Sequence, residues 1–466
     1  MEKLTTDIKL SFRQRLDYGV CEFGYNAIYY WVSAFMTIFY TDIVGVSLAA
    51  VSALTLFVRI FDAINDPIIG SMADRTRSKW GRYKPWIAIG GPVLAVLVVL
   101  LFSAQPGWPD HIKVIYMWVI YILVTVASTC TNMPFGALNG VLTSNSNERN
   151  KLAGLRMVIG NLGMNFTGIV AIPLVLLFGG AAAGGGQSAQ GYFWAVFLIA
   201  VISIPFMLWT ATKVKEVIKP APSQRKIPLK KQFAAFFKNK YAVITALSFL
   251  VCGFYSYGRM TMMTYYFTYV SNNAGLMSIT GFIGIGTGII GSGFLTPIMY
   301  NKLKLKGVRN KGFAIFVSYM ISAVLSIPMF FTSANGIVFW IFYALSSIFS
   351  SAGIGIAYGL IGDCADYGEY KQDVRVDGFL ASFISLMMKA GGAIGPAVLL
   401  LWIDNLGYVA NTVQNAGVLG ALNFSITLLP AILMAVTAIM FLFYNLNEKR
   451  QMEIRAELDQ RHLERQ

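Results

Sequence analysis

Long apolar stretches recur along this chain, and they restrict its fold more than any other feature. We mark about twelve, each of roughly 20 or more mostly apolar residues, the length that an α-helix needs to cross about 30 Å of hydrocarbon. They are centred near residues 29, 59, 94, 125, 165, 202, 255, 288, 321, 348, 390 and 432. Because a backbone in hydrocarbon must satisfy its hydrogen bonds internally, we expect an all-α membrane protein with twelve transmembrane helices.

The net charge of +15 is concentrated in alternate connections between these stretches. Lys and Arg gather in residues 75–84, 149–151 and 302–311, whereas residues 179–191 and 404–417 contain neither. By the positive-inside rule, both termini are expected in the cytoplasm, and the protein in the plasma (bacterial inner) membrane. No basic stripe alternates with exposed aromatic residues, so a nucleic-acid partner is not expected.

A basic segment divides the chain into halves with six apolar stretches each. Residues 213–240 carry nine Lys or Arg against one Glu, together with three prolines. We expect an N-terminal six-helix bundle (1–212), a cytoplasmic basic linker (213–240), a C-terminal six-helix bundle (241–446) and a cytoplasmic tail (447–466), as in transporters built from two halves. Such a linker can also bind anionic lipid, although we interpret it mainly as a determinant of topology.

Charged residues interrupt the second apolar stretch. Arg59, Asp62 and Asp66 lie inside it, where a charge is costly unless it faces a partner, an ion or water. Asp62 and Asp66 are four residues apart and Asn65 is three from Asp62, so one helix face presents several oxygen ligands. These oxygens suit a hard cation or a proton. The alternative is that the two carboxylates only pair with Arg59 and another basic residue.

Other polar residues within apolar stretches are candidates for the same site or for a sugar site. Thr129 and Asn132 in the fourth stretch can complete an ion shell or bind a polar substrate, but small hydroxylated residues also pack helices together. In the first stretch, Tyr25 and Asn26 offer the apolar faces and hydrogen-bonding edges that bind sugar rings.

Three basic residues lie in or near later stretches: Arg156, Arg259 and Lys389. The arginines can hydrogen-bond sugar hydroxyls or pair bidentately with a carboxylate, and the sequence does not decide between these roles. Lys389 is a candidate for a charge that exchanges partners with Asp62 or Asp66 during transport. The alternative for Lys389 is a fixed salt bridge between the halves.

Two charged strings, residues 74–86 and 363–371, are expected as cytosolic loops after the second and tenth stretches. Their opposite charges can form ion pairs that break when a cytosolic gate opens, although the basic residues are equally compatible with a purely topological role. The residues assigned to this gating network are Arg59, Arg82, Lys84, Asp363, Asp366, Glu369 and Arg375.

Together, the motifs RxFDAINDP (59–67), RSKWGRYKPW (77–86) and DYGEYK (366–371) resemble the glycoside-pentoside-hexuronide:cation symporter family. This is the melibiose permease-like branch of the major facilitator superfamily. The resemblance extends over nearly the whole chain. It implies import of a glycoside coupled to sodium, lithium or a proton, by alternating access between two six-helix bundles.

The resemblance also implies roles for individual residues. The cation site would consist of Asp62, Asn65, Asp66 and Thr129, and Lys389 and Arg156 would match a functionally important lysine and a sugar-contacting arginine. The residues expected to form the sugar site are Tyr25, Asn26, Asn132, Arg156, Arg259, Ser385 and Lys389. No cofactor is expected beyond the coupling ion, for which we prefer Na⁺ at Asp62 and Asp66 over H⁺ because Asn65 and Thr129 are both present.

Departures from the family pattern concern the cargo. Asn26 and Asn132 stand where the α-galactoside carrier of the family has aspartates, and Gly136 stands at an aromatic stacking position. These differences disfavour an α-galactoside and leave neutral glycosides, xylosides and hexuronides open. Rival interpretations are a lysolipid symporter, a channel and a membrane-embedded enzyme, although the sequence contains no HExxH or GxSxG motif.

Overall fold

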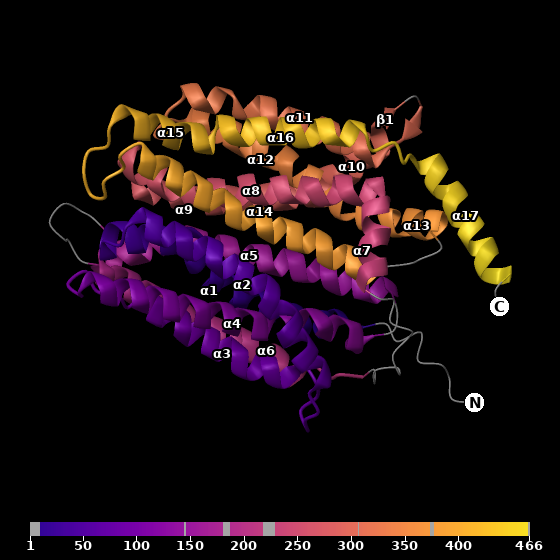
Figure 1. Ribbon diagram of the computed structural model, residues 1–466, viewed down its shortest axis with the longest axis horizontal. Helices are drawn as coiled ribbons and strands as arrows, with labels where there is room; N and C mark the ends of the chain where they lie inside the picture. Colours follow the sequence, from indigo (N-terminus) through magenta and orange to yellow (C-terminus); the bar gives the residue numbers. More distant parts are fainter. Residues whose placement is uncertain are drawn as a thin grey trace. The chain divides into compact units, whose positions relative to one another are not determined.

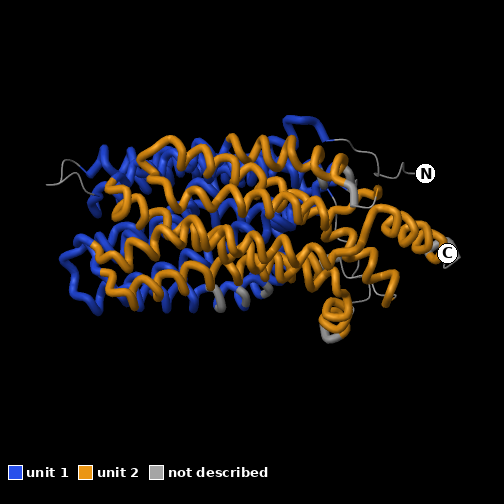
Figure 2. The backbone as a smooth tube through the Cα atoms, turned by 90° about the horizontal axis from the view of Figure 1, so that it is seen from above, with its two compact units in different colours: residues 1–222, 273–285, 409–413 blue, residues 223–272, 286–408, 414–466 orange. Residues whose placement is uncertain are grey.

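The computed structural model describes residues 10–143, 146–179, 187–217, 229–305, 307–372 and 377–464. Within these residues the chain is almost entirely helical, and the strands are one antiparallel pair of two residues each, β1 (Lys304–Leu305) and β2 (Val308–Arg309). The chain divides into two compact units, which Figure 2 shows in blue and orange. Unit 1 comprises residues 1–222, 273–285 and 409–413, and unit 2 comprises residues 223–272, 286–408 and 414–466.

Unit 1 is built from long helices that pack side by side (Figure 1). Its helices are α1 (Phe12–Ile38), continued by the π-helix η2 (Phe39–Val44), then α2 (Leu48–Arg75), α3 (Lys84–Leu101), α4 (Asp110–Leu142), α5 (Ser146–Gly179), α6 (Ala189–Lys213), the short η3 (Ala274–Leu276) and most of α9 (Met277–Thr287).

Unit 2 has the same all-helical character. Its helices are α7 (Leu229–Lys238), α8 (Lys240–Tyr269), η4 (Gly288–Leu295), α10 (Thr296–Lys302), α11 (Lys311–Ser326), η5 (Pro328–Phe331), α12 (Ile337–Tyr358), α13 (Leu360–Gln372), α14 (Asp377–Asn405), α15 (Ala416–Ile426), α16 (Leu428–Leu442) and α17 (Glu448–Glu464).

The helices agree with the expected membrane spans. Among the residues described, eleven helices or helical runs are long and apolar enough to cross a bilayer. The twelfth expected span is α2, whose described apolar part is Leu48–Val58. Each of the twelve expected centres lies inside one of the helices given above. The all-α membrane fold is therefore confirmed.

Small residues bring the helices that carry the candidate site into close contact. A Cβ at Gly163 of α5 would lie 2.9 Å from the Cα of Phe23 on α1. In unit 2, a Cβ at Gly253 of α8 would lie 2.9 Å from the backbone nitrogen of Gly392 on α14. Close backbone approach at small residues is a common way for membrane helices to pack, and it fixes the polar side chains on these four helices.

The expectation that residues 363–371 form a loop is wrong. They belong to α13, which follows α12 after the single residue Gly359. The charged side chains of this segment therefore recur at helical spacing, and its N-terminal half is buried against neighbouring helices of unit 2. The basic segment 213–240 likewise contains a helix, α7.

Candidate functional site

The acidic pair of α2 meets a hydroxyl of α4. Thr129 Oγ1 lies 3.2 Å from Asp62 Oδ1 and 3.1 Å from Asp66 Oδ1, and Thr129 is 3% exposed. The same hydroxyl lies 3.1 Å from the backbone oxygen of Thr125, one turn earlier on α4. The spacing of four residues places both carboxylates on one face of α2, and the packing of α2 on α4 brings Thr129 between them.

The Thr129 hydroxyl has three acceptors within hydrogen-bonding distance but only one proton to donate. It can therefore satisfy one of them at a time. Two carboxylates that converge on one hydroxyl also repel each other unless a proton or a cation reduces their charge. The geometry thus gathers oxygen ligands and negative charge at one point of a membrane span.

Asn65 and Arg59 differ from the other residues predicted for this region. Asn65 is buried, at 7% exposure, and its Nδ2 has no hydrogen-bond partner among the described residues. Its role as an ion ligand stays a prediction. The backbone of Arg59 lies in α2, but its side chain is outside the described residues, as is Arg375.

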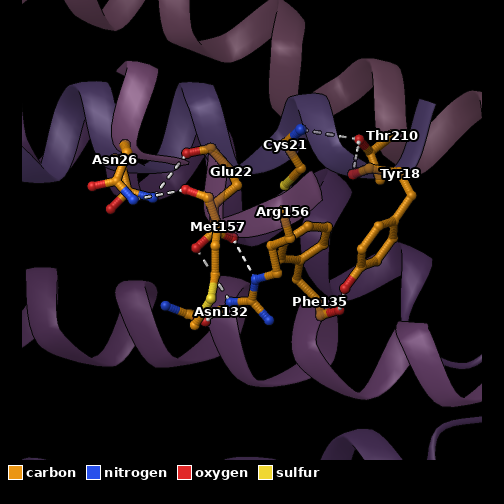
Figure 3. Close-up of polar contacts among 10 residues, drawn as sticks. Tyr18, Cys21, Glu22, Asn26, Asn132, Phe135, Arg156, Met157 and Thr210 are labelled. Atoms are coloured by element: carbon orange, nitrogen blue, oxygen red, sulfur yellow. Dashed lines mark hydrogen bonds and ion pairs between the residues drawn. The ribbon is translucent and has the colours of Figure 1, made fainter. Parts of the chain in front are cut away.

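A second polar cluster of unit 1 surrounds Arg156 on α5 (Figure 3). Arg156 Nε donates to Glu22 Oε2 at 2.8 Å, and Nη2 donates to Glu22 Oε1 at 3.3 Å and to Asn132 Oδ1 at 2.8 Å. The guanidinium carbon also lies 4.6 Å from the centre of the Phe135 ring. Arg156 is therefore held by an ion pair, an amide and an aromatic face, and its role as a sugar ligand stays a prediction.

Gly136 provides the room that this arginine occupies. A Cβ at Gly136 would lie 3.3 Å from Arg156 Nη1, and its neighbour Phe135 stacks on Tyr18 with ring centres 4.7 Å apart. A larger side chain at position 136 would therefore displace the guanidinium. The aromatic contact to Arg156 comes instead from Phe135, one residue earlier.

The predicted sugar ligands of α1 lie beside this cluster. Tyr25 is buried, and its hydroxyl lies 2.7 Å from Ser128 Oγ. Asn26 Nδ2 donates to the backbone oxygen of Glu22 at 3.0 Å, which leaves the Asn26 carbonyl oxygen turned away from its own helix backbone (Figure 3). Tyr25, Asn26, Asn132 and Arg156 thus gather on the facing surfaces of α1, α4 and α5.

The predicted ligands of unit 2 are in different environments. Arg259 on α8 places its guanidinium carbon 4.7 Å from the Tyr343 ring centre and Nη2 3.8 Å from Met329 Sδ. No described carboxylate pairs with Arg259, and its Nε is buried without a hydrogen-bond partner. On α14, Ser385 is exposed and Lys389 is half-buried. Arg259 differs from Arg156 in lacking a neutralising acid within the described chain.

The basic string after α2 is organised by an acid that the sequence analysis did not select. Glu216, just beyond α6, accepts hydrogen bonds from the backbone nitrogens of Arg82, Tyr83 and Lys84 at 2.7, 2.9 and 3.2 Å. The carboxylate thereby caps the N-terminus of α3, where free N–H groups and the helix dipole favour an anion. Arg82 and Lys84 contribute their backbone here.

The acids of α13 have partners within unit 2. Asp363, at 3% exposure, accepts from Lys311 Nζ at 2.6 Å and from Gln451 Nε2 at 2.8 Å, and Asp366 accepts from Arg455 Nε at 3.0 Å. Glu369 is buried. Gln451 and Arg455 belong to α17, which also buries Ile454 and Leu458 in the core of unit 2. The tail is therefore a docked helix.

An ion-pair cluster near the beginnings of α1 and α5 ties these two helices together. Glu148 at the start of α5 accepts from Lys151 Nζ at 2.9 Å and from Arg15 Nε at 3.1 Å. These cations, Lys151 first, lower the pKa of the Glu148 carboxyl from its usual value. The acid remains charged at neutral pH and joins the beginnings of the two helices.

Glu22 and Glu216 organise two of these clusters, although the sequence analysis assigned neither acid to a site. Glu22 lies in the first span, where any carboxylate requires a partner, and Arg156 is a cation that needs one. Glu216 is the only acid in residues 213–240. Their isolation among apolar or basic residues was the available signal, but neither partner can be located without the fold.

The family model described as MFS/sugar transport protein matches residues 17–448. The isoprimeverose transporter of Lactiplantibacillus pentosus is 31% identical over 461 residues, which cover 96% of this chain and 91% of that protein. The glucuronide carrier protein homolog of Escherichia coli strain K12 is 27% identical, with 97% and 96% covered. A solved D-xylose-proton symporter shares the fold, with a TM-score of 0.63 at 13% identity over 92% of this chain and 95% of that one.

These matches confirm the resemblance to the symporter family and exclude the membrane-embedded enzyme. Transport of sugar-like substrates, rather than catalysis, is the activity that the matched proteins share. The chain is a multi-pass membrane protein and belongs to the MFS/sugar transport protein family.

Proposed function

We propose that this transporter is a cation-coupled symporter that imports a glycoside, pentoside or hexuronide by alternating access, with Na⁺ as the coupling ion. The observation that carries the proposal is the Thr129 hydroxyl, which lies 3.2 and 3.1 Å from two carboxylates of α2. Asp62 and Asp66 supply charge and oxygen ligands, and Thr129 supplies a neutral one. Asn65, buried on the same helix, is the proposed fourth ligand.

Sodium is favoured over a proton by the neutral ligands. A proton needs only one carboxylate oxygen, whereas a hard cation is held by several oxygens at once, and hydroxyl and amide oxygens serve it as well as carboxylates do. Li⁺ would use the same ligands. Coupling further requires that the ion and the sugar change each other's affinity by the same factor, because binding linkage is reciprocal.

For the sugar, unit 1 supplies Tyr25, Asn26, Asn132 and Arg156. The positive charge of Arg156 is neutralised by Glu22, so Arg156 and the two amides suit the hydroxyls of a sugar ring. The relatives include proteins named for isoprimeverose and for a glucuronide, and both kinds of cargo are compatible with these donors.

In unit 2, Ser385, Lys389 and Arg259 are the proposed sugar ligands. Arg259 is a buried cation without a described acid, and burying such a charge is costly unless an anion approaches it. This observation favours an acidic glycoside among the substrates. A preference for neutral glycosides over their uronic acid counterparts would contradict this part of the proposal.

The test is uptake into proteoliposomes that contain the full-length protein, with Na⁺ and proton gradients imposed separately. Radiolabelled methyl glucuronide, methyl glucoside and methyl xyloside are compared under each gradient. We expect accumulation against the sugar gradient only with inward Na⁺, and its loss in Asp66→Asn. Equal accumulation with a proton gradient in Na⁺-free buffer would refute sodium coupling, and equilibration without accumulation would indicate a channel.

A further inference from the structure

The helix α7 in the basic connecting segment has an unusual composition for a linker. Its sequence from Leu229 to Lys238 is LKKQFAAFFK, and residues 229–240 contain four lysines and no acidic residue. Its three phenylalanines, Phe233, Phe236 and Phe237, lie between Lys231 and Lys238. Such a short helix gains little stability from its own hydrogen bonds, so it depends on what its faces contact.

One face of α7 is anchored to unit 2. Phe236 is 2% exposed and lies 4.4 Å from the Phe383 ring at the beginning of α14, measured between ring centres. On α13, Gln372 Nε2 donates to the backbone oxygen of Ala235 at 2.9 Å. Asn239, directly after α7, caps α8 and donates to the backbone oxygen of Cys364. The position of α7 within the unit is therefore fixed by several elements.

The rest of the α7 surface is apolar and basic, and much of it is exposed. Phe237 is 64% exposed and Phe233 is 41% exposed, four residues apart on one side of the helix. Each also touches a ring of α14 at its inner edge, since Phe233 lies 4.9 Å from Phe379 and Phe237 lies 6.3 Å from Phe383 between ring centres. Lys231 and Lys238 are exposed seven residues apart, two turns along the neighbouring side. Neither lysine forms an ion pair with a described residue, so this face combines two exposed aromatic rings with two uncompensated charges.

The orientation of α7 matches a membrane surface. Figure 1 shows α7 crosswise to α8 and α14, at the end where both of these helices begin. Lys240, two residues after α7, is the first residue of the membrane span Lys240–Tyr269. A helix that crosses the ends of spans in this way is oriented as amphipathic helices are that lie along a bilayer surface.

We propose that the exposed face of α7 is a binding surface for anionic phospholipid headgroups of the bilayer. Phe233 and Phe237 enter the boundary between headgroups and acyl chains, while Lys231 and Lys238 contact lipid phosphates. Charge complementarity favours this occupant. The face carries only positive charge, and each exposed lysine is attracted to an anionic membrane surface. A soluble acidic protein would not require two exposed aromatic rings beside a membrane span.

The proposal is tested on the full-length protein with a fluorescent probe on α7. Ala234, exposed between the aromatic and basic sides, is replaced by cysteine and labelled in a Cys130→Ser background, because the other three cysteines are buried. The protein is reconstituted in vesicles of phosphatidylcholine with 20% phosphatidylglycerol. Quenching by spin-labelled phosphatidylglycerol and by spin-labelled phosphatidylcholine then gives the relative association of the two lipids at the probe.

We expect the labelled site to favour phosphatidylglycerol, and Lys231→Gln/Lys238→Gln to reduce that preference on the order of tenfold. High salt should reduce it similarly, because exposed charges are screened. The matched control is Lys215→Gln/Lys449→Gln, which removes two other exposed lysines and should leave the preference unchanged. A probe on Ile439, a 49% exposed residue of α16, reports any general enrichment of the anionic lipid.

Equal quenching by the two lipids at position 234 in the wild-type protein would overturn the proposal. So would a preference that survives the double replacement, or one that the control pair abolishes equally. Loss of quenching by both lipids would show that α7 lies away from the bilayer, and would overturn the proposal as well. None of these readouts depends on the coupling ion or on the sugar, so the result is independent of the proposed transport function.

Discussion

Replacing Glu22 with glutamine isolates the ion pair that holds Arg156. The change preserves the shape of the side chain and removes its charge, while Arg156 keeps its hydrogen bond to Asn132 and its contact with Phe135. In the wild type, the pair is joined by two hydrogen bonds of 2.8 and 3.3 Å, and the side chains of Arg156 and Glu22 are 23% and 12% exposed.

The expected loss of stability follows from this burial. Removing one partner of a fully buried pair costs about 3–5 kcal/mol, because the other charge is left uncompensated. Partial exposure of both side chains screens the remaining charge, so we expect about 2–3 kcal/mol. For a unit of this size, such a loss lowers the melting temperature by roughly 5–10 °C. The double replacement Glu22→Gln/Arg156→Gln removes both charges and should recover about 2 kcal/mol relative to the sum of the single changes.

Thermal unfolding of the detergent-solubilised proteins, followed by tryptophan fluorescence, measures this coupling. The control is Asp17→Asn on the same helix, whose carboxylate accepts only a hydrogen bond from Trp209 among its described contacts. It should shift the melting temperature by less than about 2 °C. Additive effects of the two single replacements would refute the reasoning. In uptake assays, Glu22→Gln should also raise the ratio of glucuronide to neutral glycoside transport, since Arg156 then carries a free charge.

Three further predictions concern other contacts. Thr129→Val should raise the Na⁺ concentration for half-maximal uptake roughly tenfold or more, because it removes a hydrogen bond to charged groups. In the same uptake titration, the control Thr125→Val, one turn away, should change this concentration less than about threefold. Gly81→Ala should destabilise the protein by about 1–3 kcal/mol in thermal unfolding, because φ is +116° there and a Cβ would lie 2.6 Å from Glu216 Oε1. The pKa of Glu148 is lower in the folded state, so the charged carboxylate stabilises the fold. This stabilisation is complete above the unfolded pKa of about 4.3 and is lost as the pH falls through the folded pKa. Glu148→Gln should therefore flatten the acid side of the curve of melting temperature against pH.

Much of the fold was predictable because hydropathy along a membrane chain reports directly on burial in lipid. The spacing of Asp62 and Asp66 likewise placed both acids on one helix face. The segment 363–371 was misjudged because its many charges carry no hydropathy signal of a helix, and α13 is held by contacts from distant parts of unit 2, including Arg455 and Lys311.

The partners of the site depend on contacts that are remote in sequence. Glu22 and Arg156 are 134 residues apart, and no local pattern connects them. Thr129 was a candidate as a polar residue of the fourth apolar stretch, but its position between the two acids requires the packing of α2 on α4. Helix periodicity can therefore nominate polar residues of a span, but the choice of partner for each comes from tertiary packing.

The docked tail has a practical consequence for handling the protein. Trimming the chain after the last span, a common step before crystallisation, would remove Gln451 and Arg455 from the acids of α13 and uncover the pocket filled by Ile454 and Leu458. An affinity tag joined beyond residue 464 leaves these contacts in place. A tag that replaces α17 is expected to lower the yield of folded protein, even though every transmembrane helix is retained.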